Sequence, residues 1–208
     1  FLDFDLRANV VQKSYIMKIL LTLFVLFFSS SVVADDIRDF QIEGMSVGDS
    51  LLDYYSEKEI NKSRKVTKYK DKTYTTATFY EKLNMYDAIS VSYKTKDNNF
   101  IIEGIRGNKV FNNRFKECYK QQDQIFDELK LLFPKSESFN TRFKDVSWSK
   151  SGSNTRQSFL KFNDGSFSGV QCYKYSKKDK KKFNVKDYLG VSLTMKEYNY
   201  WLTNIAFK

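Results

Sequence analysis

The catalytic repertoire of this chain is narrow, because its 208 residues include no histidine. The chain therefore lacks the usual general base near neutral pH, the Ser-His and Cys-His nucleophile pairs, and the commonest metal ligand. An enzyme would have to use paired carboxylates, as glycosidases do, or a Ser-Lys pair. Ser149 and Lys150 are adjacent, but a catalytic dyad requires convergence in space, which adjacency does not provide.

Carboxylates on or beside the expected strands do not single out a catalytic pair. They are Glu81, Asp87, Glu103 and Asp164. Nothing in their spacing selects two that face each other, and ion pairs or turns explain them more simply. The sequence also lacks a Gly-rich phosphate loop, a dinucleotide fingerprint and a carboxylate-rich calcium loop. We therefore expect no catalytic, metal-binding or cofactor-binding residues, with a carboxylate- or Ser/Lys-based hydrolase of an envelope polymer as the alternative.

The cysteine content is two residues, Cys118 and Cys172. Two isolated thiols without histidine cannot complete a zinc site. An even pair in a small domain of an oxidising compartment most often forms a disulfide. Closing a loop of this length stabilises the fold by about 4 kcal/mol in the chain-entropy model. The sequence therefore predicts a disulfide between these two residues.

The strongest local charge lies in residues 176–187, SKKDKKKFNVKD. Its six lysines are Lys177, Lys178, Lys180, Lys181, Lys182 and Lys186. A solvated loop between two strands explains them, and contact with anionic lipid headgroups or envelope polymers is the alternative. The net charge of the chain is +10, yet lysine outnumbers arginine, which is the residue that makes bidentate phosphate contacts. Nucleic acid is therefore not an expected partner.

Residues 17–34, MKILLTLFVLFFSSSVVA, have the three parts of a secretory signal peptide. A lysine follows the methionine, an apolar core spans residues 19–28, and small side chains precede a cleavage site between Ala34 and Asp35. The apolar core is shorter than the roughly 20 residues that a membrane-spanning helix needs, although a membrane anchor is the rival interpretation. The segment predicts that the protein is periplasmic or secreted.

The domain organisation follows from this signal. Residues 1–16 contain no methionine, and we interpret them as an upstream or fragment extension. Cleavage after Ala34 leaves residues 35–208, a length that suits a single globular domain.

Alternating apolar and polar residues, with turn residues between them, predict a series of strands. The expected strands are 74–81, 89–111 folded as a hairpin, 155–162, 166–175, 188–195 and 198–207. Apolar spacing predicts a short helix over 46–55 and a long amphipathic helix over 112–133 with Cys118 on its apolar stripe. Residues 134–154 and 176–187 are expected to be loops. The fold class is therefore α+β, an antiparallel sheet built from hairpins with one long and one short N-terminal helix packed on one face.

Aromatic residues crowd the expected C-terminal strands. They are Tyr173, Tyr175, Tyr188, Tyr198, Tyr200 and Trp201. Packing in the core or on a sheet face explains them, and an aromatic binding surface is the alternative.

The segment FQIEGMSVGDSLLDYYSEKEI, residues 40–60, resembles the start of small exported bacterial proteins from AT-rich genomes. Within it, Ile42-Glu43-Gly44-Met45-Ser46 is similar to the start of outer-membrane assembly lipoproteins of the SmpA/BamE type. The lipidated cysteine and the Leu-Gly-x-Pro motif of that family are missing here. The resemblance implies export and no particular activity.

These observations favour an exported, non-enzymatic domain of the bacterial envelope that acts by binding. Its partner is open at this point, and an envelope protein, an envelope polymer or an anionic lipid surface would each fit. The hydrolase and the peripheral membrane binder described above are the two alternatives.

Overall fold

The computed structural model describes residues 36–65, 69–145 and 151–206, of which residues 140–144 are described by their backbone alone. These residues belong to one compact unit. The expected signal peptide, residues 17–34, its cleavage site between Ala34 and Asp35, and the Ser149-Lys150 pair lie outside them.

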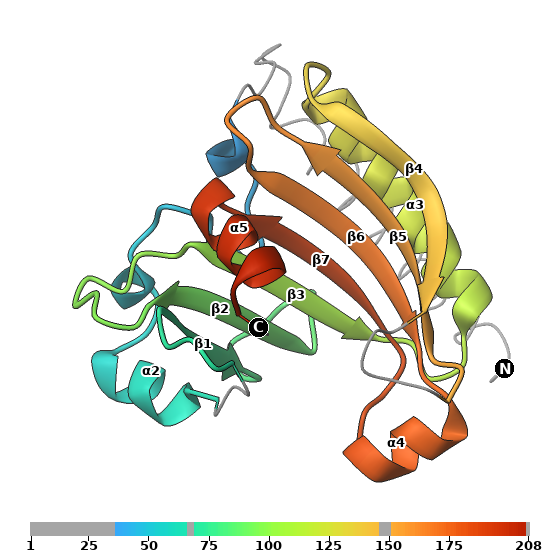
Figure 1. Ribbon diagram of the computed structural model, residues 1–208, viewed down its shortest axis with the longest axis horizontal. Coiled ribbons are helices and arrows are strands. Elements are labelled where there is room, and N and C mark those ends of the chain that lie inside the picture. Colours follow the sequence, from blue (N-terminus) through green and yellow to red (C-terminus); the bar gives the residue numbers. More distant parts are fainter. Residues whose placement is uncertain (1–35, 66–68, 146–150, 207–208) are drawn as a thin grey trace, which may run out of the picture. The chain divides into compact units, whose positions relative to one another are not determined.

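Seven strands of the described residues form one sheet in which every neighbouring pair is antiparallel (Figure 1). They are β1 (Tyr74–Phe79), β2 (Ala88–Lys94), β3 (Gly104–Val110), β4 (Glu137–Asp145), β5 (Asn154–Lys161), β6 (Phe167–Lys174) and β7 (Tyr188–Thr194). Their order across the sheet is β1-β2-β3-β7-β6-β5-β4. The last strand, β7, thus joins two three-stranded meanders. The α+β class expected from the sequence is confirmed.

The helices lie on both sides of this sheet. They are α2 (Glu57–Ser63), α3 (Phe115–Leu132), α4 (Lys177–Phe183) and α5 (Lys196–Asn204), with 3-10 turns η1 (Ile37–Asp39) and η2 (Leu51–Asp53). Figure 1 shows α3 behind the sheet and α5 in front of it. The fold therefore has helices on two faces, because α5 lies opposite the long helix rather than beside it.

The main core lies between α3, the N-terminal segment and one face of the sheet. Side chains alternate between the two faces of a strand, and the register aligns Val91, Ile105 and Leu193 across β2, β3 and β7. These three side chains are fully buried, together with Leu51 of the N-terminal segment and Leu129 of α3. We call this side of the sheet the core face.

The opposite side, which we call the open face, carries polar residues along its central strands. Hydroxyl pairs link β1 to β2, with Thr76 2.9 Å from Ser92 and Thr78 3.1 Å from Ser90. Helix α5 covers one end of this face, where the Ser92 hydroxyl donates to Tyr198 at 2.9 Å. Beneath α5, aromatic side chains form a small second apolar cluster.

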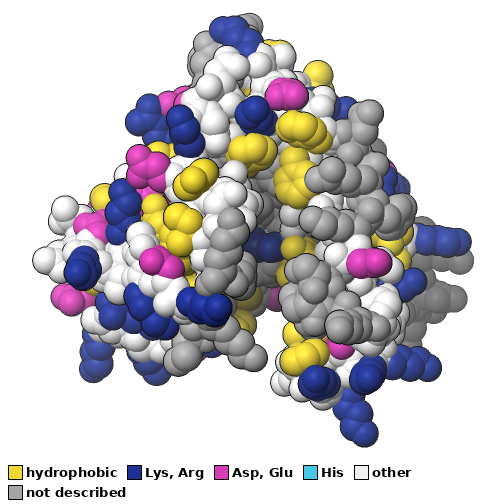
Figure 2. All heavy atoms as spheres, viewed as in Figure 1, with side chains coloured by type: hydrophobic (Ala, Val, Ile, Leu, Met, Phe, Trp, Pro, Cys, Tyr) yellow, Lys and Arg dark blue, Asp and Glu magenta, His cyan; other side chains and the backbone are white. Residues whose placement is uncertain are grey.

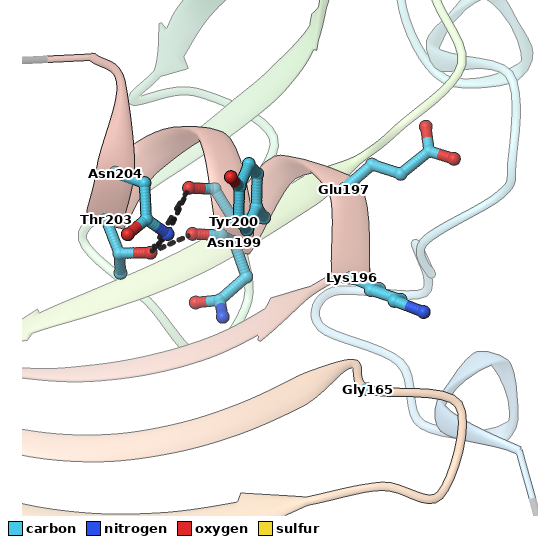
Figure 3. Close-up of a pocket in the computed structure, with 7 residues that line it drawn as sticks. All are labelled: Gly165, Lys196, Glu197, Asn199, Tyr200, Thr203 and Asn204. Carbon is cyan, nitrogen blue, oxygen red and sulfur yellow. Dashed lines mark hydrogen bonds between the residues drawn. The ribbon is translucent and has the colours of Figure 1, made fainter.

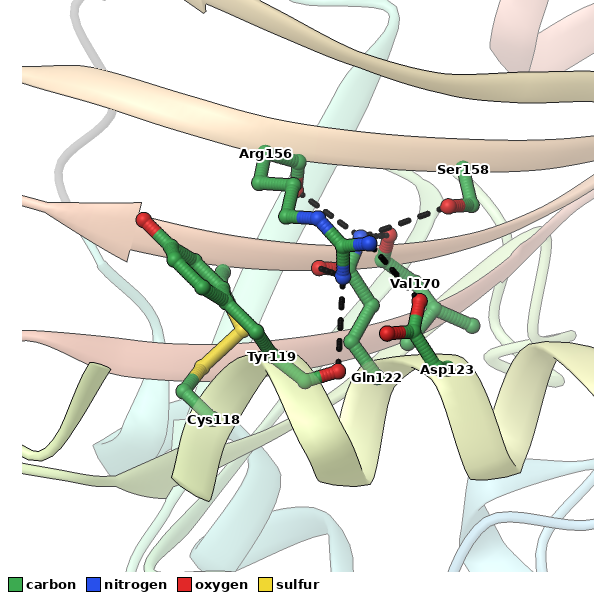
Figure 4. Close-up of a disulfide and its surroundings, with 8 residues drawn as sticks. Cys118, Tyr119, Gln122, Asp123, Arg156, Ser158 and Val170 are labelled. Atoms are coloured by element: carbon green, nitrogen blue, oxygen red, sulfur yellow. Dashed lines mark hydrogen bonds and ion pairs between the residues drawn. A yellow bond between two sulfur atoms is a disulfide. The ribbon is translucent and has the colours of Figure 1, made fainter. Parts of the chain in front are cut away.

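A disulfide ties α3 to the core face of β6. Cys118 and Cys172 form the disulfide that the sequence predicts (Figure 4). Their Sγ atoms are 1.99 Å apart and their Cα atoms are 6.1 Å apart. One turn further along α3, Gln122 is fully buried and donates to the backbone carbonyls of Arg156 and Val170 at 3.0 and 2.9 Å. The disulfide and this glutamine fix the helix to β5 and β6.

The helix expected over residues 46–55 is wrong, since only the 3-10 turn η2 forms there. Gly48 has a φ of +93°, in the left-handed region that interrupts a helix. The N–H of Gly48 donates to the carbonyl of Ile102, and that of Leu51 donates to the carbonyl of Phe100. Pairing with this distant segment takes up the backbone groups that a helix would have used.

The final strand, expected over residues 198–207, is also wrong, because residues Lys196–Asn204 form α5. Tyr198 and Trp201 are its buried residues, and their spacing of three positions is a helical one. The β propensity of aromatic residues favours a strand over these positions, whereas the burial of Tyr198 and Trp201 requires a helix.

Both expected loops contain regular structure. Residues 134–154 include the edge strand β4, whose polar composition is typical of a sheet edge. Residues 176–187 include α4, where the Ser176 side chain accepts from the N–H of Asp179 at 3.1 Å. The S-x-x-D pattern at 176–179 is a helix-start signal that explains this difference.

Candidate functional site

The four candidate carboxylates hold strand ends and turns. Asp87 accepts a 2.7 Å hydrogen bond from the last backbone N–H of β3, and Asp164 accepts one of 2.9 Å from a backbone N–H in its own turn. Glu103 lies 3.4 Å from a lysine ammonium, and Glu81 is exposed. These contacts give three of the four carboxylates separate local roles and favour no pair for hydrolysis.

The open face carries a more unusual group of residues at its centre, where β3, β7 and β6 are neighbours. We call it the Arg106 cluster, and it consists of Arg106, Asn108, Gln171, Tyr173 and Tyr188. The register places Arg106 and Asn108 on β3 beside Ser192 and Gly190 of β7, and Gly190 beside Gln171 of β6. The Arg106 side chain crosses β7, because its Nη2 donates to Gln171 Oε1 on β6 at 2.9 Å.

Two tyrosine rings support the Arg106 guanidinium. Tyr173 and Tyr188 are stacked on each other with ring centroids 4.6 Å apart. The guanidinium carbon lies 4.8 Å from the Tyr173 centroid and 5.4 Å from the Tyr188 centroid. The Tyr173 hydroxyl also donates to Gln171 Oε1, at 2.6 Å. Together the two cation–π contacts stabilise the charge by about 1–2 kcal/mol at a partly desolvated site.

The cluster has a positive charge without a carboxylate to balance it. Two of the described arginines, Arg106 and Arg156, are half-buried. Arg156 forms an ion pair with Asp123, and Arg106 forms none with the described residues. Its Nε atom and Oδ1 of Asn108, two residues along the same strand face, are buried without a hydrogen-bond partner in the described part of the chain. Withdrawing part of such a charge from water without a counter-ion has a free-energy cost. Both atoms therefore offer hydrogen-bonding capacity that the fold leaves unused.

The protonation states of the cluster follow from its surroundings. Burial lowers the pKa of Arg106, but the neighbouring Tyr173 and Tyr188 raise it, and the net shift is upward. Burial also raises the pKa of Tyr188, against the opposing effect of Arg106, and raises that of the adjacent Tyr175. At neutral pH the guanidinium is therefore charged and these tyrosines are neutral, so the cluster carries a net positive charge.

Arg156, on the core face of β5, is also half-buried and provides a comparison for Arg106 (Figure 4). Its Nη2 lies 2.8 Å from Asp123 Oδ1, its Nη1 donates to Gln122 Oε1 at 3.1 Å, and its guanidinium carbon lies 5.2 Å from the Tyr119 centroid. Arg156 thus has aromatic support and a carboxylate, whereas Arg106 has aromatic support alone. The difference marks Arg106 as a functional candidate, because structural arginines are normally paired.

A glycine makes room for the Arg106 guanidinium. A Cβ on Gly190 would lie 2.3 Å from Arg106 Nη2 and 2.5 Å from Nε, so the guanidinium could not keep this position beside it. Figure 2 shows the side of the sheet that faces away from α3, hollowed in the middle, with Lys or Arg side chains visible inside the hollow. Arg106 is only half-buried, so part of it is open to solvent and to a ligand.

The six lysines of residues 176–187 differ in their exposure and contacts. Lys180 pairs with the buried Asp187 and donates to Asn113 Oδ1 at 2.8 Å. The other predicted contact residues, Lys177, Lys178, Lys181, Lys182 and Lys186, are exposed. Five of the six residues are therefore available to a partner, and the sixth has a structural contact.

A shallow pocket of about 440 Å³ lies between the β5–β6 turn and the outer side of α5 (Figure 3). Its polar groups are engaged in their own helix, since Thr203 Oγ1 donates to the carbonyl of Asn199 at 2.8 Å and Asn204 Nδ2 to that of Tyr200 at 2.9 Å. Lys196 at its rim is exposed. The pocket thus lacks the buried, unpaired groups that distinguish the Arg106 cluster.

Sequence reasoning missed the Arg106 cluster. One local signal is present, because alternation along β6 places Gln171 and Tyr173 on one face of the strand. The position of β7 between β3 and β6 was needed to bring Arg106 and Tyr188 to that face, and no local pattern contains it.

Within residues 36–65, 69–145 and 151–206, no three potential metal ligands cluster, and no helix has the length and apolar character to cross a membrane. Comparison of the chain with protein-family models, with curated proteins and with solved structures finds no match. The resemblance of residues 42–46 to envelope lipoproteins therefore carries no further argument, and the function is inferred from the chemistry of the site.

Proposed function

We propose that this protein is an exported, non-enzymatic binding domain that takes an anionic group of an envelope ligand at the Arg106 cluster. The observation that carries the proposal is the half-buried guanidinium, which is held by two tyrosines and one glutamine and has no carboxylate partner. A ligand anion would supply the missing charge and form charge-assisted hydrogen bonds, which are about twice as strong as neutral ones.

Two further observations support export. Residues 17–34 have the composition of a signal peptide. Cys118 and Cys172 lie at disulfide distance, and structural disulfides persist in oxidising compartments such as the bacterial periplasm. A periplasmic or secreted protein meets envelope polymers and peptides, many of which carry carboxylates.

The surroundings of Arg106 favour a carboxylate attached to a hydroxylated or planar group. The guanidinium fork matches a carboxylate in two parallel hydrogen bonds. Stacked tyrosine rings offer flat apolar surface beside it, and Ser and Thr hydroxyls line the neighbouring strands of the open face. A sugar acid combines these features in one molecule.

The test compares glucuronate with glucose, which differ in the carboxylate. In titrations of ¹⁵N-labelled protein, we expect glucuronate to shift the backbone amides of the Arg106 cluster with a Kd in the millimolar range, and glucose to leave them unchanged. A Kd of about 1 mM corresponds to about 4 kcal/mol of binding free energy, which suits one charged contact with stacking.

Matched variants show whether Arg106 carries the binding. Arg106→Gln should weaken glucuronate binding at least about tenfold, the effect of losing one hydrogen bond to a charged group. Arg114→Gln removes the same charge from an exposed position and should leave the affinity unchanged. The proposal fails if acetate, sulfate, phosphate and glucuronate all leave the cluster unperturbed, or if both variants bind like the wild type.

A further inference from the structure

In helix α4 and the residues after it, the carboxylates are buried and most of the lysines are exposed. The segment 176–187 contains two carboxylates and six lysines. Asp179 and Asp187 are 4% and 1% exposed, whereas five of the lysines are exposed. The sequence shows a mixed-charge segment, but its accessible surface is basic.

Internal contacts of the fold hold both carboxylates in place. The Asp179 carboxylate accepts from the hydroxyl of Ser153, and the Asp179 backbone N–H donates to the side chain of the N-cap, Ser176, at 3.1 Å. Asp187 accepts from the backbone N–H groups of Tyr175 at 2.8 Å and Asn113 at 3.1 Å, and it pairs with Lys180. Neither carboxylate is therefore placed to neutralise the outward lysines.

The outward side of the helix combines four cations with an exposed aromatic ring. We define the α4 basic face as Lys177, Lys178, Lys181, Lys182 and Phe183. Phe183 is 42% exposed, and the Lys182 ammonium lies 4.9 Å from the centroid of its ring. Figure 2 shows Lys and Arg side chains gathered at the lower end of the molecule, where Figure 1 places α4.

We propose that the α4 basic face docks the protein onto the surface of a bilayer that contains anionic phospholipids. The four clustered lysines complement the negative surface potential of such a bilayer. An aromatic side chain among them is suited to enter the boundary between headgroups and acyl chains. This surface shares no residue with the Arg106 cluster and consists of exposed lysines rather than a half-buried arginine, so the inference does not depend on the function proposed above.

The experiment is cosedimentation of the full chain with large vesicles of phosphatidylcholine alone or with phosphatidylglycerol. Phosphatidylcholine vesicles measure any binding that does not depend on lipid charge, including binding by the apolar residues 19–28. We expect phosphatidylglycerol to raise the affinity, and raised salt to reverse this gain because it screens exposed charges.

Two quadruple variants with the same change in net charge localise the effect. Replacing Lys177, Lys178, Lys181 and Lys182 with Gln should lower affinity for phosphatidylglycerol vesicles at least about a hundredfold, since each lysine near an anionic surface contributes about fivefold. Replacing Lys58, Lys62, Lys116 and Lys120, which are exposed on α2 and α3, should lower it much less. Near-UV circular dichroism checks that both variants are folded.

Phe183→Ala distinguishes a lipid surface from other polyanions. It should weaken vesicle binding about fivefold, because part of an apolar side chain no longer leaves water, and leave binding to soluble heparin unchanged. The proposal is overturned if phosphatidylglycerol adds no affinity or if the two quadruple variants behave alike. It is also overturned if heparin binds as tightly as the vesicles while Phe183→Ala has no effect on either, since the face would then be a general polyanion site.

Discussion

Replacing Gly190 with alanine tests the placement of the Arg106 side chain. The added Cβ would lie 2.3 Å from Arg106 Nη2 and 2.8 Å from its Cζ, so the guanidinium must leave its place over β7. Gly190 itself does not have a left-handed φ. Alanine at a strand interior is favoured over glycine by about 0.5–1 kcal/mol. Any net loss of stability therefore has to come through Arg106.

The size of this loss can be worked out from the contacts. A displaced guanidinium gives up its 2.9 Å hydrogen bond to Gln171, a contact of a charged group that contributes about 1.5 kcal/mol. It also gives up its place over the rings of Tyr173 and Tyr188, worth about 1–2 kcal/mol. After the gain from alanine is subtracted, Gly190→Ala should lower the free energy of unfolding by about 2 kcal/mol.

Urea unfolding of four proteins provides the assay: the wild type, Gly190→Ala, Arg106→Ala and the double variant. In the Arg106→Ala background the clash is absent, so the same glycine substitution should stabilise the protein by about 0.5 kcal/mol. The change of sign is a coupling between the two sites of about 2–3 kcal/mol. Equal destabilisation in both backgrounds would refute the reasoning, because alanine would then act on the strand and not on Arg106.

Three further predictions concern stability. Replacing both cysteines with serine should cost about 2–5 kcal/mol, and urea unfolding of the reduced wild type should match that of the variant. Lys180→Met leaves the buried Asp187 without its cation and should lower the free energy of unfolding by about 3–5 kcal/mol. The exposed control Lys181→Met should change it by less than about 0.5 kcal/mol. Similar values for the two variants would contradict the structural role of Lys180. Burial raises the pKa of Glu43, but hydrogen bonds from three backbone N–H groups lower it more, so the net shift is downward. A lowered pKa stabilises the fold above the unfolded pKa of about 4.3 and ceases to do so as the pH falls through the folded pKa. The stability deficit of Glu43→Gln, measured by thermal unfolding, should therefore shrink as the pH is lowered from about 7 to about 3, and a constant deficit would disprove this role.

The sequence was sufficient for the features that depend on local periodicity. The fold class followed from alternation in the strands and from the apolar stripe around Cys118. The pairing of Cys118 with Cys172 followed from counting cysteines. The fold class is readable because a 3.6-residue or two-residue period reports which side of an element is buried, and the disulfide because two cysteines allow only one pairing.

Features that depend on distant contacts were beyond local patterns. The segment around Gly48 does not form a helix because its backbone groups pair with residues 100–102. The inward direction of Asp179 and Asp187 depends on partners as far away as Asn113 and Ser153. The Arg106 cluster likewise requires β7 to lie between β3 and β6. In each case tertiary hydrogen bonds, which a sequence window does not contain, decide the outcome.

The central claim is that Arg106 is an unpaired cation that receives a ligand anion. The most direct measurement is the side-chain Nε–H spectrum of ¹⁵N-labelled protein during titration with glucuronate, with glucose as the matched neutral sugar. Arg106 and Arg156 are both supported by tyrosine rings, and Arg156 already has the carboxylate of Asp123. The account predicts that glucuronate shifts the Arg106 signal and leaves that of Arg156 in place, with no response to glucose. An unchanged Arg106 signal, or equal shifts of both arginines, would contradict it.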